Sequence, residues 1–195
     1  MAFEIELKAH VEQDNVENVK SLIEKLPSVI YQGYTDKFDL YWSTDRESEP
    51  LFRTRKEVSD KGTVVLFTAK PQKAKTEEGT EKNLELEFCA PEDQWDRVLA
   101  FCEGSGLKVC KVKSKKGYGY LSVIDGFDIH IELLEVKYLG WFIEMEICPT
   151  TLDGFDVEAA DKALRKVLSF VNISEEAVEI AGYNRMLTAI GREKG

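Results

Sequence analysis

The sequence is poor in the residues on which many enzymes depend. Only two histidines occur among its 195 residues, His10 and His130, and none of the four cysteines has the spacing of a metal site. A zinc centre or a Ser-His-Asp triad therefore has little material to draw on. The motifs GxxxxGK[ST] and GxGxxG are also missing, which removes the usual glycine-rich cradles for phosphate.

Long apolar runs are missing too. No stretch approaches the roughly 18 residues of a membrane-spanning helix, and the N-terminus has no basic start followed by an apolar stretch, so we expect no membrane partner and no signal peptide. The 26 basic residues are outnumbered by 36 acidic ones, a net charge of −10 that argues against nucleic acid as a partner. Cysteines without paired spacing indicate free thiols in a reducing compartment, and we expect a cytoplasmic protein.

A length of 195 residues without an internal repeat or linker predicts a single domain over residues 1–195, and hydrophobic periodicity predicts its elements. Helices are expected at 14–26, 91–104, 156–171 and 174–190. Residues 71–83 have almost no apolar content and are predicted to form a loop. Strands are expected at 3–11, 30–42, 51–57, 63–70, 83–88, 107–116, 117–124, 127–137 and 141–148.

Charged residues alternate with apolar ones along many of these strands, so that the charges of each strand share one face. One interpretation is a set of solvated faces with weak cross-strand ion pairs. The other is an antiparallel sheet that closes into a barrel around a charged interior, and the repetition over many strands favours it. The alternating charges are Glu4, Glu6 and Lys8; Arg53 and Arg55; Glu85 and Glu87; Lys111, Lys113 and Lys115; and Glu144 and Glu146. We therefore expect an α+β fold, an eight-stranded antiparallel barrel with its helices packed outside.

A mixture of glutamate with lysine and arginine suits a polyanion bound together with a hard cation. Glutamates provide oxygen ligands for Mg²⁺ or Mn²⁺, and Mg²⁺ typically takes one or two carboxylates together with substrate phosphates. Arginine and lysine bind the remaining phosphate oxygens. Basic side chains from several strands of a tunnel wall can do so without a glycine-rich loop.

The order of these motifs resembles the CYTH superfamily, also called triphosphate tunnel metalloenzymes, over essentially the whole chain. Glu4-x-Glu6-x-Lys8 matches its N-terminal ExExK signature. The motifs that follow are Arg53-x-Arg55, a strand that ends in Lys70, Glu85-x-Glu87, Lys113-x-Lys115, Leu139-Gly140-x-Phe142-x-Glu144-x-Glu146, and Tyr183 with Leu187.

The resemblance implies an eight-stranded tunnel with inward-pointing charges and a role for each of them. Glu6, Lys8 and Glu144 are expected to take part in catalysis. The residues expected to hold Mg²⁺ or Mn²⁺ are Glu4, Glu6, Glu85, Glu87, Glu144 and Glu146. Those expected to bind the phosphates are Lys8, Arg53, Arg55, Lys70, Lys113 and Lys115.

Two positions depart from the family pattern. Leu134 stands where the family usually has an Asp, which removes one expected metal ligand, and Glu132 lies on the same strand face and is a candidate to replace it. Lys115 stands at the position of the family's usual Arg.

Three functions follow from the resemblance. The first is metal-dependent hydrolysis of a triphosphate, either tripolyphosphate or an organic triphosphate. The second is a class IV adenylyl cyclase that converts ATP to cyclic AMP and pyrophosphate. The third is a module that binds triphosphate or polyphosphate without turning it over, for which Leu134 is the argument. In each case the expected partner is a small triphosphate, and a homodimer is left open.

Overall fold

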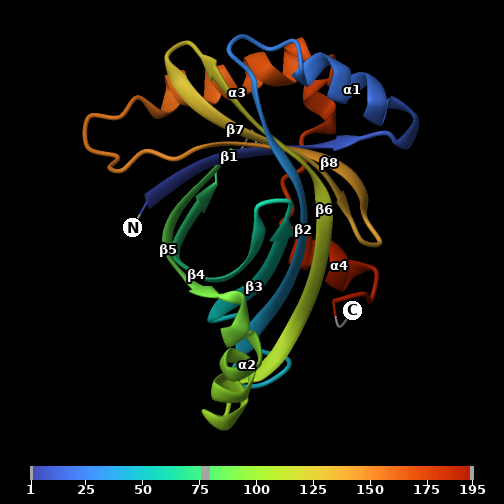
Figure 1. Cartoon of the computed structure of the whole chain (residues 1–195). Coiled ribbons are helices and arrows are strands. Elements are labelled where there is room, and N and C mark those ends of the chain that lie inside the picture. Colours follow the sequence, from blue (N-terminus) through green and yellow to red (C-terminus); the bar gives the residue numbers. More distant parts are fainter. Residues whose placement is uncertain (1, 76–79, 194–195) are drawn as a thin grey trace.

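Eight antiparallel strands close into a barrel in the computed structural model, which describes residues 2–75 and 80–193. The order around the barrel is β1-β5-β4-β3-β2-β6-β7-β8, so the first strand closes the sheet between β5 and β8 (Figure 1). The predicted α+β barrel is therefore confirmed. Its strands are β1 (Ala2–Val11), β2 (Ile30–Ser43), β3 (Phe52–Ser59), β4 (Gly62–Lys75), β5 (Glu81–Pro91), β6 (Lys108–Ile124), β7 (Phe127–Val136) and β8 (Gly140–Ile147).

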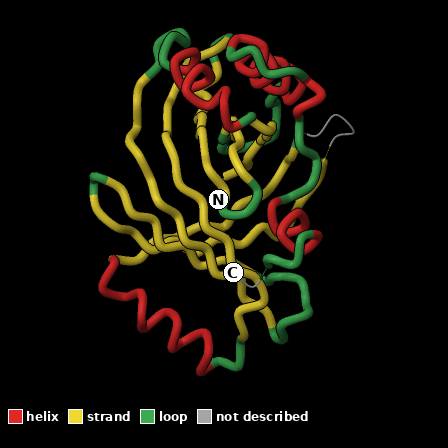
Figure 2. Tube along the Cα trace, turned by 90° about the vertical axis from the view of Figure 1, so that its right-hand side faces the viewer, coloured by secondary structure: helices red, strands yellow, loops and turns green. Residues whose placement is uncertain are grey.

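The helices lie outside the barrel, at opposite ends of the molecule (Figures 1 and 2). Helices α1 (Val16–Ile23) and α3 (Val157–Phe170) lie together at the end that is uppermost in Figure 1, and α2 (Trp95–Gly104) lies at the other end. The short α4 (Tyr183–Ala189) lies beside β6. Among the described residues, no helix is both long and apolar enough to span a membrane.

The main hydrophobic core lies between α1, α3 and the outer face of the barrel. Ile5 and Leu7 of β1 are fully buried in it together with Leu164 and Val167 of α3. Helix α3 begins where the side chain of Asp156 accepts a hydrogen bond from the Ala159 N–H. Because strand side chains alternate between faces, burial of the apolar residues on the outer face turns the charged residues of β1 into the barrel.

A smaller cluster anchors α2 against the outside of β2. Trp42 and Cys102 are almost fully buried in it, and the Trp42 indole N–H donates to the Thr54 hydroxyl at 2.9 Å. This cluster fixes the end of β2 from which the β2–β3 connection starts.

Three predictions about elements are wrong. The segments 107–116 and 117–124 form one strand of 17 residues, β6, rather than two. The expected loop 71–83 is mostly strand, because β4 continues to Lys75 and β5 starts at Glu81; residues 76–79 lie outside the described part. The last helix does not run from 174 to 190: a 3-10 turn, Glu175–Ala177, precedes a segment in which Val178 pairs with Ala9, and the α-helix starts at Tyr183.

Candidate functional site

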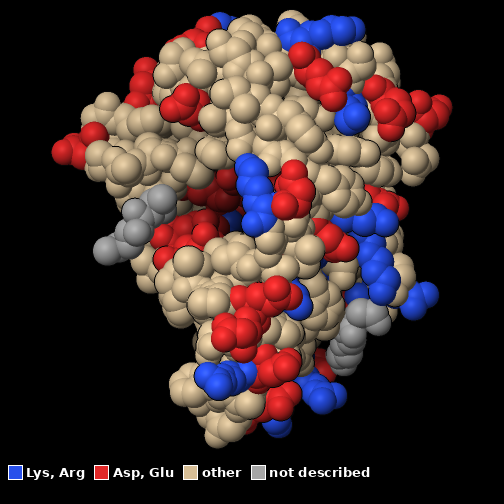
Figure 3. Space-filling view, viewed as in Figure 1, with Lys and Arg blue, Asp and Glu red and all other residues tan. Residues whose placement is uncertain are grey.

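The barrel encloses a cavity of about 850 Å³, within the size range of small-molecule sites. Every residue that the sequence predicts for the site contributes to its lining: Glu4, Glu6, Lys8, Arg53, Arg55, Lys70, Glu85, Glu87, Lys113, Lys115, Glu144 and Glu146. The lining has as many acidic as basic side chains. Figure 3 shows a hollow in which acidic side chains gather, with basic side chains at its edge.

Carboxylates from three strands gather in one part of the cavity. The β1–β8 register places Glu6 directly opposite Glu146, and Glu4 lies on the same face of β1. The Lys70 ammonium lies 2.6 Å from Glu4 Oε2 and 2.8 Å from Glu85 Oε1, and it is the cation of this group. Four of the six predicted metal-side glutamates are thus brought together around a single lysine.

This acidic group has too little positive charge near it. Burial and the carboxylate of Glu4 raise the pKa of Glu6 to about 7, and burial and Glu4 raise the pKa of Glu146 well above its usual value. Glu4 itself behaves differently: burial opposes its ionisation, but Lys70 outweighs burial and lowers its pKa. A further cation at Glu6 and Glu146 would relieve this repulsion.

The chemistry of this donor set fits Mg²⁺ or Mn²⁺, because all of its ligands are hard carboxylate oxygens. In the conformation described here, no three Asp, Glu, His or Cys side chains of the described residues converge into a ready-made metal cage. Mg²⁺ usually takes only one or two carboxylates and completes its shell with water and substrate phosphates. Glu6 and Glu146 meet that requirement.

Basic side chains gather in another part of the cavity around a buried aspartate that the sequence analysis missed. Asp39 of β2 is fully buried. Arg55 donates to both of its oxygens, at 2.6 Å from Nε and 3.1 Å from Nη2, and Lys113 Nζ lies 3.2 Å from Oδ2. Burial opposes the ionisation of Asp39, but Arg55, Lys113 and Arg53 outweigh it and hold its pKa well below the usual range.

The two predicted phosphate-binding arginines differ in what they can still bind. Arg55 is engaged by the bidentate pair with Asp39. Arg53 donates from Nη2 to the Thr68 hydroxyl at 2.9 Å, but its buried Nε has no hydrogen-bond partner among the described residues. A buried donor without a partner is costly, so Arg53 is the arginine poised to take an anionic oxygen.

Four further side chains of the cavity lining form ion pairs with one another. Lys115 Nζ lies 2.5 Å from Glu144 Oε2 and 3.5 Å from Glu132 Oε2, and Lys37 donates to Glu132 Oε1. Burial opposes the ionisation of Glu144, but Lys115 and Lys113 lower its pKa strongly, so it stays a carboxylate. Leu134 is fully buried on the same face of β7 as Glu132, and Glu132 lines the cavity. Glu132 is therefore the nearest acidic side chain on this face of β7, two residues from Leu134, and it is paired with Lys37 and Lys115.

Helix α4 forms part of the cavity wall. The Lys8 ammonium donates to the Ala181 carbonyl at 2.9 Å and lies 4.8 Å from the centre of the Tyr183 ring, which packs on Phe142. Burial and the nearby Glu144 raise the pKa of Tyr183 well above 10, so its hydroxyl keeps its proton at neutral pH. Lys8 thus connects the ExExK strand to the C-terminal segment.

Not all predicted metal-side residues belong to the acidic group. Glu87 accepts from the Thr68 hydroxyl at 2.7 Å and lies 4.0 Å from Arg53, so it faces the basic group, and Glu144 faces Lys115. The roles assigned to the site residues therefore remain predictions.

The structure adds residues to the site that the sequence analysis did not choose. One set was visible in the alternation of β2, where Lys37, Asp39 and Tyr41 share the inner face. Asn184 and Arg185 lie on α4, and no strand alternation marks them.

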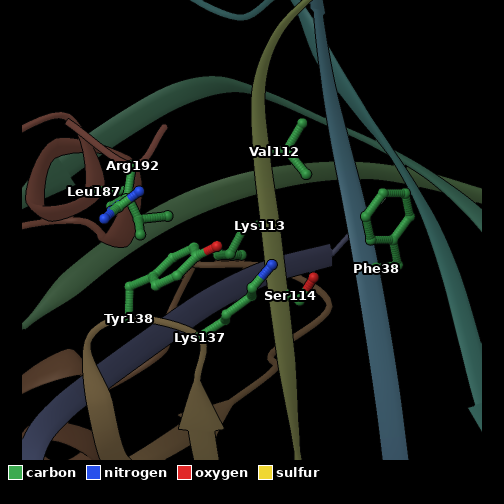
Figure 4. Close-up of a pocket in the computed structure, with 8 residues that line it drawn as sticks. All are labelled: Phe38, Val112, Lys113, Ser114, Lys137, Tyr138, Leu187 and Arg192. Atoms are coloured by element: carbon green, nitrogen blue, oxygen red, sulfur yellow. The ribbon is translucent and has the colours of Figure 1, made fainter. Parts of the chain in front are cut away.

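A second cavity lies outside the barrel, between α4, β6 and the turn from β7 to β8 (Figure 4). Its volume is about 100 Å³, room for a few water molecules but not for a triphosphate. Tyr138 and Arg192 line it, with their side chains stacked at 5.2 Å. We therefore place the candidate site in the barrel cavity.

Comparison with known proteins places the fold. No family model and no curated protein matches the chain. The PH1819 protein of Pyrococcus horikoshii superposes with a TM-score of 0.74 and 23% identity, over 96% of this chain and 99% of that one. A putative adenylate cyclase from Vibrio parahaemolyticus superposes with a TM-score of 0.70 and 16% identity, over 95% of this chain and 98% of that one. A putative adenylyl cyclase from Hippeastrum with a dominant triphosphatase activity superposes with a TM-score of 0.60 and 15% identity, over 98% of this chain and 97% of that one.

At these identities the likeness shows the fold. The chain shares the fold of these solved structures, and its closed eight-stranded barrel is the one that the resemblance in its sequence implied. The chains that it matches are covered almost from end to end.

Proposed function

We propose that this protein is an enzyme that hydrolyses a triphosphate inside its barrel with the help of Mg²⁺ or Mn²⁺. The observation that carries the proposal is the division of one enclosed cavity into an acidic group short of cations and a basic group with an unpartnered arginine donor. The first suits a divalent cation and the second suits phosphate oxygens. Structural neighbours described as putative cyclases, one with triphosphatase activity, support the same chemistry.

Residues in different parts of the cavity would bind the phosphates and the metal. Arg53 and Lys113 would bind phosphate oxygens at the basic group, while Arg55 and Asp39 keep this wall rigid. Glu6 and Glu146 would hold the divalent ion, which when bound supplies charge neutralisation and Lewis-acid activation.

Three further residues would act on the reacting end of the chain. Lys8 and Lys115 would stabilise charge on the transferred phosphoryl group. Glu144, held as a carboxylate by Lys115, and Glu6 are the candidates to accept the proton of the attacking water at a carboxylate oxygen.

Product analysis by ³¹P NMR tests the proposal. The protein is incubated with tripolyphosphate or ATP, with and without Mg²⁺ or Mn²⁺, and orthophosphate is the expected product only when metal is present. Pyrophosphate with cyclic AMP would establish a cyclase instead. Binding without product would establish a binding module, for which Leu134 in place of the family's usual Asp is the argument. Absence of both binding and turnover would overturn the proposal.

Two variants test the residues. Glu6→Gln and Glu144→Gln should each lower the metal-dependent rate by at least about 100-fold, the scale expected for a positioned acid-base group or metal ligand. The matched control is Glu176→Gln, because Glu176 is exposed on a 3-10 turn outside the cavity. Electron paramagnetic resonance of free Mn²⁺ gives a second readout, in which Glu6→Gln should weaken Mn²⁺ binding about 10-fold or more. Wild-type rates and wild-type Mn²⁺ binding in the Glu6 variant would contradict its assignment.

A further inference from the structure

The basic end of the cavity has a rim that the phosphate-binding residues do not explain. One side of this rim is the end of the β2–β3 connection, Pro50 and Leu51, and the other is Asn184, Thr188 and Ala189 of α4. The Lys113 ammonium lies between β2 and α4, at 5.6 Å from the centre of the Tyr41 ring and 5.1 Å from the centre of the Tyr183 ring. The name rim is used for these five lining residues: Pro50, Leu51, Asn184, Thr188 and Ala189.

The β2–β3 side of the rim is held in place and is apolar. The Leu51 N–H donates to the Trp42 carbonyl at 2.8 Å, and the Ser43 hydroxyl donates to the Glu49 carbonyl at 2.8 Å. Leu51 nevertheless keeps 56% of its surface exposed, at the edge of a cavity whose interior is charged. A leucine fixed in this position offers an apolar surface to whatever enters the cavity.

The α4 side of the rim offers a hydrogen-bond acceptor. The side-chain oxygen of Asn184 is buried and has no partner among the described residues. A buried acceptor without a partner is costly, and a ligand that donates to it recovers this cost. Helix α4 is itself anchored, because Tyr183 packs on Phe142 with ring centres 4.9 Å apart.

An inorganic chain of phosphates cannot use either feature. Its surface consists of anionic oxygens, which accept hydrogen bonds and have no apolar face. A triphosphate with an organic substituent can use both, if the substituent has an apolar face for Leu51 and an N–H or O–H for Asn184. With the phosphates at Arg53 and Lys113, such a substituent would lie at the rim.

We propose that the rim recognises the organic group of the substrate, and that this protein acts on organic triphosphates of the nucleoside triphosphate class in preference to tripolyphosphate. This inference rests on the proposed triphosphate function of the same cavity. It adds the substrate class and names Leu51 and Asn184 as the residues that determine it.

The test compares ATP with tripolyphosphate in the wild type and in two rim variants, Leu51→Ser and Asn184→Ala. The wild type should have a kcat/KM at least 10-fold higher for ATP. Each variant should lower kcat/KM for ATP by about 5- to 30-fold, mainly through KM, and change the value for tripolyphosphate by less than 2-fold. The matched control is Ile190→Ser, because Ile190 is 50% exposed next to α4 but does not line the cavity.

Several results would overturn the inference. They are a wild type that prefers tripolyphosphate, rim variants that lose activity toward both compounds equally, and rim variants with unchanged activity toward ATP. Unchanged far-UV circular dichroism and melting temperature show that a variant is folded.

The failure of the proposed function can be told apart from the failure of this inference. If the wild type hydrolyses neither compound, the function fails, and the rim is then judged by equilibrium dialysis with ATP and tripolyphosphate. Selective loss of ATP binding in Leu51→Ser and Asn184→Ala would still support recognition of the organic group, and equal binding of ATP by all variants would refute it.

Discussion

At the scale of single residues, the cavity depends on how each charge is compensated. Asp39 is fully buried and neutralises Arg55 and Lys113, whereas Lys70 pairs with Glu4 and Glu85, and burial and neighbouring carboxylates raise the pKa of Glu6 and Glu146. Asp39 is therefore a structural charge, because removing it leaves its buried partners uncompensated. Buried charges that lack a partner are the ones available to a ligand.

Replacement of Asp39 by Asn should therefore destabilise the protein. We expect a loss of about 3–5 kcal/mol in the free energy of unfolding at pH 7, because the variant leaves Arg55 and Lys113 buried without their counter-charge. The native pKa of Asp39 lies below that of the unfolded chain, so its contribution is fully present above about pH 4 and is lost as the pH falls further.

Urea unfolding at pH 7 and at lower pH measures this effect. The difference between wild type and Asp39→Asn should narrow toward acid pH. Asp36→Asn is the matched control, since Asp36 lies on the same strand with its side chain exposed, and its effect should stay within about 0.5 kcal/mol. Equal stability of wild type and Asp39→Asn at pH 7 would refute the structural role.

Among the elements, the 17-residue strand β6 makes long pairings on both sides of the barrel wall. It pairs with β2 on one side and β7 on the other, and it supplies Lys113 and Lys115 to the cavity. Gly117 allows this pairing, because a Cβ added there would lie 2.0 Å from the Leu133 carbonyl oxygen. The sequence analysis placed a strand boundary at this glycine, whereas its actual role is the close approach of β7.

Substitution of Gly117 by Ala should weaken this contact. We expect a destabilisation of about 1–3 kcal/mol or more, because the added methyl group meets rigid backbone rather than a movable side chain. Gly119→Ala is the control on the same strand, since its Cβ would be 3.6 Å from the nearest atom, and it should be tolerated. Chemical unfolding of both variants measures the difference, and equal stability of the two would show that the strands adjust freely.

At the scale of the whole molecule, closure of the barrel makes the first strand indispensable to every other. β1 pairs with both β5 and β8, and its outer face packs on α3, so the N-terminal residues connect strands from distant parts of the chain. Without β1, the edges of β5 and β8 would be left unpaired and the barrel would be open. One domain over residues 1–195 stays a prediction, and unfolding experiments test it.

Unfolding should then be a single cooperative transition. We expect the near-UV and far-UV circular dichroism signals to coincide in urea, and the calorimetric enthalpy to equal the van't Hoff enthalpy. Two separate transitions would show that α2 and its strands, or another part, fold independently.

The alternation of charge along the strands is a property of the sequence alone, and together with the family resemblance it predicted the barrel and the proposed residues that line its cavity. This was possible because side-chain direction in a strand depends only on position along the chain. Which charges meet depends on the tertiary structure: Arg55 pairs with Asp39, and Glu87 faces Arg53. The side-chain oxygen of Asn184 lies at the rim and has no hydrogen-bond partner in the described part of the chain. Such pairings depend on strand register and on the packing of α4, which bring together residues far apart in the sequence, and the pKa of each group follows from these neighbours rather than from its own strand.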